Sequence, residues 1–120
     1  MEITKENVAA LLVQHGVIPQ ALVDQLDGDE HFLNVMDVVV GLAHVGKTLL
    51  GTDDNKDLLS FAVRIFLMGP EEGTKLCRVA ALILDIGGSH GDVRSFIGAA
   101  LREARASKLA EIAIAKASAH

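Results

Sequence analysis

Residues 29–51 read DEHFLNVMDVVVGLAHVGKTLLG, and the spacing of polar residues in this stretch has the period of a helix. Asn34, Asp37, Gly41, His44 and Thr48 follow one another at steps of three and four, which places them on one helical face and not on alternate faces of a strand. Asp29 is a good N-terminal cap, and Gly51 suits the left-handed residue that ends a helix. The pattern predicts one long helix from Asp29 to about Leu50.

The same stretch contains a full match to the phosphate-loop pattern Gly-x-x-x-x-Gly-Lys-Ser/Thr, from Gly41 to Thr48. A working phosphate loop needs a strand before it and a helix that begins at the Lys-Thr pair. After Leu50, however, no apolar residue appears at helical spacing until Leu58. We interpret the match as accidental and expect a protein that is not an enzyme. The alternative is a nucleotide-binding protein that uses Gly41, Gly46, Lys47 and Thr48.

Signals that begin and end helices recur along the whole chain. Further helices are predicted over about residues 5–15 with Thr4 as cap, 19–26, from Thr52 or Asp53 to Gly69, 70–86, and from Ser89 onward, where Asp92 completes a capping box. The almost absent linker at Gly69 implies an antiparallel hairpin. The sequence predicts an all-α fold: a compact six-helix bundle, or an orthogonal array of antiparallel helical hairpins, in a single domain of residues 1–120.

Composition limits the class of protein. The chain has 120 residues, half of them apolar, with four Phe and no Trp or Tyr, so the core must be built from aliphatic side chains. The single cysteine, Cys77, excludes an intramolecular disulfide, and the acidic start lacks the features of a secretion signal. We expect a cytoplasmic protein.

Charge is distributed unevenly along the chain. Residues 1–60 carry three basic and ten acidic side chains, and residues 61–120 carry eight and six. The first two predicted helices have the outline of a helix-turn-helix, but the second offers no Lys or Arg for phosphates. The longest uncharged stretch has 17 residues and several polar ones, too short and polar for a membrane span. We expect neither a nucleic-acid nor a membrane partner.

No arrangement of reactive side chains predicts a catalytic, cofactor or metal site. No two of the five histidines stand three or four residues apart, so no helix presents two imidazoles to one ion. Asp85, His90 and Asp92 form the only local cluster of possible ligands, and helix capping accounts for Asp92. Cys77 has no His or carboxylate at helical spacing, which indicates a structural thiol.

Three predicted helices have thin polar stripes, which favours a fold in which they are largely surrounded. Covering all of them strains a six-helix domain, so we expect a self-association surface and a homo-oligomer. In the last helix the apolar phase slips near Ser107, which predicts a kink or a separate terminal helix. Residues 107–120 are expected to project or fray.

These observations favour a non-catalytic protein–protein interaction or adaptor domain that also binds itself. The expected contact surfaces are the basic stripe of the last helix and an apolar edge of the tail: Arg94, Arg102 and Arg105, and Leu109, Ile112 and Ala113. A solvated face is the alternative interpretation of the arginines.

Overall fold

The computed structural model describes residues 2–118 and confirms the predicted all-helical fold. Helix makes up 79% of the described residues, which contain no strand. Six helices occur within this range: α1 (Val8–Gln14), α2 (Gln20–Gln25), α3 (Glu30–Leu50), α4 (Asn55–Met68), α5 (Pro70–Asp85) and α6 (His90–Ser118).

The ends of α3 and the start of α6 are fixed by the residues that the sequence indicated. The Asp29 carboxylate accepts a hydrogen bond of 2.9 Å from the Phe32 amide, and Gly51 ends α3 with a φ of 64°. At α6, the Ser89 amide donates to Asp92 while the Asp92 amide donates to the Ser89 hydroxyl, at 2.9 and 3.1 Å. The reciprocal pair is the predicted capping box.

Two predicted caps are wrong by a few residues. The cap of α4 is Asp54, whose carboxylate accepts from the amides of Lys56 and Asp57, and not Thr52 or Asp53. Instead, the Thr52 hydroxyl accepts from the Asp54 amide and so holds the cap in place. Near the N-terminus the chain turns at Thr4, but α1 begins only at Val8. Where several carboxylates and hydroxyls lie within three residues, the sequence does not specify which of them caps the helix.

The core lies where α3 crosses α4. Leu58, Leu59 and Ala62 of α4 are fully buried, and α3 meets them with a side that carries Gly46. A β-carbon at Gly46 would lie 2.8 Å from Cδ1 of Phe61, so the two helices approach closely only because this residue has no side chain.

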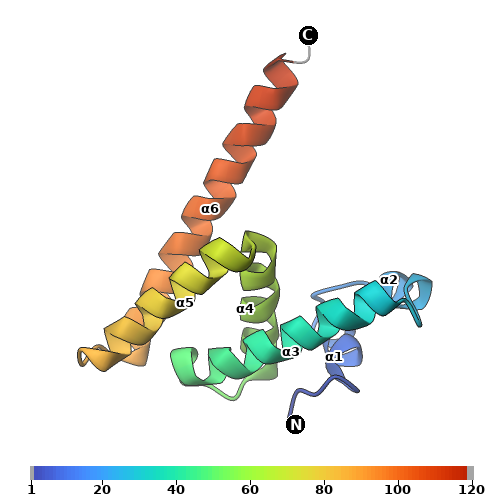
Figure 1. Ribbon diagram of the computed structural model, residues 1–120, viewed down its shortest axis with the longest axis horizontal. Helices are drawn as coiled ribbons and strands as arrows, with labels where there is room; N and C mark the ends of the chain where they lie inside the picture. The colour runs from blue at the N-terminus through green and yellow to red at the C-terminus, as the bar shows by residue number, and fades with distance from the viewer. Residues whose placement is uncertain (1, 119–120) are drawn as a thin grey trace.

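The helices form a flat molecule with one projecting arm, with extents of 45 × 44 × 22 Å (Figure 1). Gly69 alone separates α4 from α5, and α5 and α6 then run side by side in opposite directions. In Figure 1 the last part of α6, drawn in red, leaves the other helices and extends beyond them. We call residues 105–118 the tail, and residues 2–104 the body.

Two expectations are wrong, one about how fully α5 is covered and one about how α6 ends. The second half of α5 is not surrounded, since Val79 and Leu82 are 43% and 56% exposed. Up to Ser118, the last residue that the structure describes, there is also no terminal helix separate from α6, which continues through Ser107 as one helix of 29 residues. Alanine is the strongest helix former, and the alanines after Ser107 keep the backbone helical although the apolar phase shifts.

Candidate interaction surface

The phosphate-loop string lies inside α3, as its period predicted. From Gly41 to Thr48 the backbone is helical, so its amide groups donate along the helix and form no loop around an anion. Gly46 is buried against α4, Thr48 is exposed, and Lys47 Nζ lies 3.8 Å from the Asp53 carboxylate. These residues do not assemble a phosphate cradle.

The predicted arginine stripe is divided between two roles. Arg94 Nε donates to the Leu50 carbonyl at 3.0 Å, at the C-terminal end of α3. A ring nitrogen of His90 lies 3.3 Å from the neighbouring Leu49 carbonyl. Because carbonyls at a helix C-terminus lack partners within the helix, Arg94 stabilises the fold at this point. Arg102 and Arg105 are exposed on the outer surface, and their role as partner contacts stays a prediction.

The tail exposes aliphatic side chains that nothing in the body covers. Every residue from Arg105 to Ala117 is exposed. Leu109, Ile112 and Ile114 are 57%, 43% and 66% exposed. Ile114 was not among the expected contact residues, although it follows Ala110 by four residues and shares its face. Leu109, Ile112 and Ile114 therefore all lie on one projecting segment, the first two on one face and Ile114 on the other.

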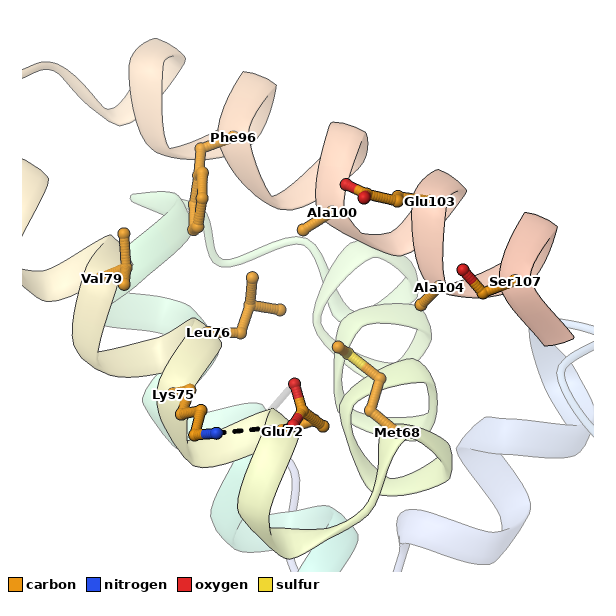
Figure 2. A pocket seen from close by; sticks show the side chains of 10 residues that line it. All are labelled: Met68, Glu72, Lys75, Leu76, Val79, Phe96, Ala100, Glu103, Ala104 and Ser107. Carbon is orange, nitrogen blue, oxygen red and sulfur yellow. Dashed lines mark ion pairs between the residues drawn. The ribbon is translucent and has the colours of Figure 1, made fainter.

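A groove runs between α5 and α6 and ends where the tail begins (Figure 2). It has a volume of about 360 Å³. In Figure 2, Phe96, Ala100 and Ala104 point from α6 toward α5, and Leu76 points back from α5. Its apolar lining is Met68, Leu76, Val79, Phe96, Ala100 and Ala104, with Glu72, Lys75, Glu103 and Ser107 at the edges. Sequence reasoning missed this groove, because it depends on how two helices pair.

A second hollow, of about 420 Å³, lies between α4 and α6 beside the end of α3. Arg64 and Arg94 line it together with Asp57, Ser60 and several apolar side chains. Arg94 is held by its bond to Leu50, whereas Arg64 is exposed and forms no ion pair with any residue in the described part of the chain. The hollow is therefore lined by both acidic and basic side chains and is open to water.

The titratable groups of the described residues form no reactive cluster. Residues 2–118 contain no group of three His, Cys, Asp or Glu side chains that could hold a metal ion, and His120 lies outside that range. Half-buried Cys77 has a raised thiol pKa because burial disfavours the thiolate, which makes it a poor nucleophile. The backbone hydrogen bond from Ser89, and then that from its hydroxyl, lower the pKa of Asp92.

One helix of the described chain, α3, is long and apolar enough to cross a membrane by length and composition. The core helix of a soluble protein has the same properties, and here α3 contributes six buried residues to the core. Because 33% of its apolar window is buried, packing within the body accounts for part of its apolar character.

The geometry thus leaves two unoccupied apolar features on α6, the groove and the tail. Comparison of the chain with known protein families, with curated proteins and with solved structures finds no match.

Proposed function

We propose that this protein is a non-catalytic interaction domain that associates with itself through the tail of α6. The observation that carries the proposal is the exposure of Leu109, Ile112 and Ile114 on a helix that projects from a packed body. Exposed aliphatic residues scattered singly need no explanation, but here Leu109 and Ile112 share one face of a projecting helix, and Ile114 adds a third large apolar side chain on its other side.

The size of the exposed surface supports the same proposal. The chain has an accessible surface of 7791 Å², whereas a compact monomer of 12.7 kDa has about 6,200 Å². Its radius of gyration of 15.9 Å likewise exceeds the roughly 14 Å of a compact domain of this length. A stable interface covers about 800 Å² of each partner, so the excess is large enough to supply one.

The tail can bind at a low cost in conformational entropy. An isolated helix of this length is marginal in water, but the tail continues a helix that is already nucleated in the body. A partner therefore meets a preformed helix and does not have to order it.

The test is the molar mass in solution, measured by light scattering with refractive-index detection, because the chain has no Trp or Tyr to absorb at 280 nm. We expect the wild type to exceed 12.7 kDa and the triple variant Leu109→Glu, Ile112→Glu, Ile114→Glu to return to that mass. Leu33→Glu on α3 is the matched control, since Leu33 is 54% exposed, and it should leave the mass unchanged. A monomeric wild type at high concentration would refute the proposal.

A further inference from the structure

We infer that the groove between α5 and α6 is the binding site for the tail of a second copy of this chain. Two copies then exchange tails reciprocally, each tail lying in the other copy's groove. This inference rests on the proposed self-association and specifies which surfaces form it. Its support comes from the shape of the groove, the face that the tail presents, and the charges of both.

The groove has the lining that an apolar helix face requires. Large side chains of Leu76, Val79 and Phe96 form its floor and one end. On the α6 side, Ala100 and Ala104 also line the groove, and their short side chains leave room for those of an incoming helix. Helix-in-groove recognition uses this combination of a hydrophobic floor with space between the walls.

The tail presents a matching face that continues the edge of the groove. Starting from Glu103 at the edge, steps of three or four residues along α6 lead to Ala106, Ala110, Ile114 and Ala117. Residues at these spacings share one helical face. The groove edge and the tail face therefore lie on the same side of α6, one after the other along the helix.

This continuity fits a symmetric pair. If two α6 helices meet in opposite directions along that side, each tail runs past the other copy's groove edge. The small residues Ala106 and Ala110 allow the two helices to approach closely, and Ile114 supplies the large side chain for the groove. Both contacts are then identical, as in a closed dimer with two-fold symmetry, and the groove of each copy is occupied.

Charge also favours the groove over a second tail as the partner. The tail carries three basic residues, Arg105, Lys108 and Lys116, against Glu111 alone. The groove edge carries Glu72 and Glu103 against Lys75, and Lys75 is already paired with Glu72 at 3.6 Å. Two tails packed on each other would bring two segments of net positive charge together, whereas a tail in the groove lies beside an edge whose net charge is negative.

Two single variants and their mixture test the inference. Val79→Arg adds a positive charge to the groove wall but leaves the tail intact, and Ile114→Glu alters the tail but leaves the groove intact. Each variant alone is expected to be monomeric at concentrations where the wild type is a dimer of twice 12.7 kDa. Mixed in equal amounts, they should form a heterodimer, because the tail of the first still fits the groove of the second.

Val38→Arg is the matched control for Val79→Arg. It makes the same substitution at a similarly exposed valine, 49% against 43%, on α3 and outside the groove. We expect it to remain dimeric. A far-UV circular dichroism spectrum of each variant verifies that the helices are retained, since both substitutions are at exposed positions.

The outcomes separate this inference from the proposed function. A dimer that survives Val79→Arg but not Ile114→Glu would overturn the groove as the binding site, and tail-mediated self-association would still stand. A mixture of the two variants that stays monomeric would also overturn the reciprocal exchange. A wild type that is monomeric would remove both proposals together.

Discussion

Helix α4 and the tail of α6 are both fourteen residues long, yet one is the centre of the core and the other has no cover. The difference lies in the size of their apolar residues. Leu58, Leu59, Phe61, Ala62 and Ile65 of α4 are buried, mostly large side chains that only packing can satisfy. The tail carries five alanines, which favour helix without any contact. One helix therefore exists because it is packed, and the other because its backbone favours the conformation.

The largest expected effect removes packing from α4. Leu59→Ala leaves a cavity at a fully buried position and should lower the free energy of unfolding by about 2–5 kcal/mol. Leu109→Ala, the same substitution in the tail, should change it by less than about 0.5 kcal/mol in dilute protein. Urea unfolding followed by circular dichroism at 222 nm measures both. Equal losses would contradict the contrast between the two helices.

Adding a methyl group where α3 and α4 touch should have the next largest effect. In Gly46→Ala the new β-carbon meets Phe61 at 2.8 Å, and we expect a loss of about 1–3 kcal/mol. Gly41→Ala, five residues earlier on the same helix, meets nothing within 4 Å and should raise the free energy of unfolding by up to about 1 kcal/mol. The two melting temperatures should move in opposite directions. If both melting temperatures rise, helix propensity, and not close packing, determines the result.

The arginines of α6 offer a smaller contrast between a residue that serves the fold and one that does not. Arg94→Gln removes the charged hydrogen bond to the Leu50 carbonyl and should cost about 1 kcal/mol. Arg102→Gln removes an exposed charge and should be neutral for stability. Thermal unfolding of both variants under identical salt distinguishes them. If Arg102→Gln proves the more damaging, the assignment of Arg94 to the end of α3 is wrong.

The smallest expected effect concerns the cap of α6. Hydrogen bonds from Ser89 hold the pKa of Asp92 below its ordinary value of 3.8, so the ionised carboxylate stabilises the folded state above that pH. This contribution is lost as the pH falls through the lowered native pKa. Asp92→Asn should therefore reduce the melting temperature slightly at pH 7, and the difference should shrink in acid. A difference that persists unchanged at low pH would argue against the carboxylate as its source.

Much of the fold was predictable because helix ends are local. Asp29, Gly51 and the Ser89 and Asp92 pair each act within a few residues, and the sequence identifies them correctly. The cap at Asp54 was missed because three neighbouring residues had the same chemistry. The match at residues 41–48 was correctly interpreted as helix, since its periodicity extends beyond the motif on both sides.

The surface was less predictable because its features join distant parts of the chain. Arg94 donates a hydrogen bond to the Leu50 carbonyl, 44 residues away in the sequence, and no local sequence pattern predicts that contact. The exposure of Val79 depends on where α6 lies against α5, which the stripe of α5 alone does not specify. For the same reason the groove could not be anticipated, although half of its lining belongs to the helix whose tail was already singled out.

The unbroken course of α6 has a consequence for how the chain opens. Its amides beyond residue 104 can exchange their hydrogens by fraying from the end, turn by turn, without disturbing any buried side chain. Fraying that goes further must withdraw Leu101, Ile97 and Val93 from the body, and then exchange requires opening of the core. Protection of the α6 amides from hydrogen exchange should therefore change abruptly along the helix and not gradually. The amides on the carboxyl-terminal side of the change should exchange rapidly.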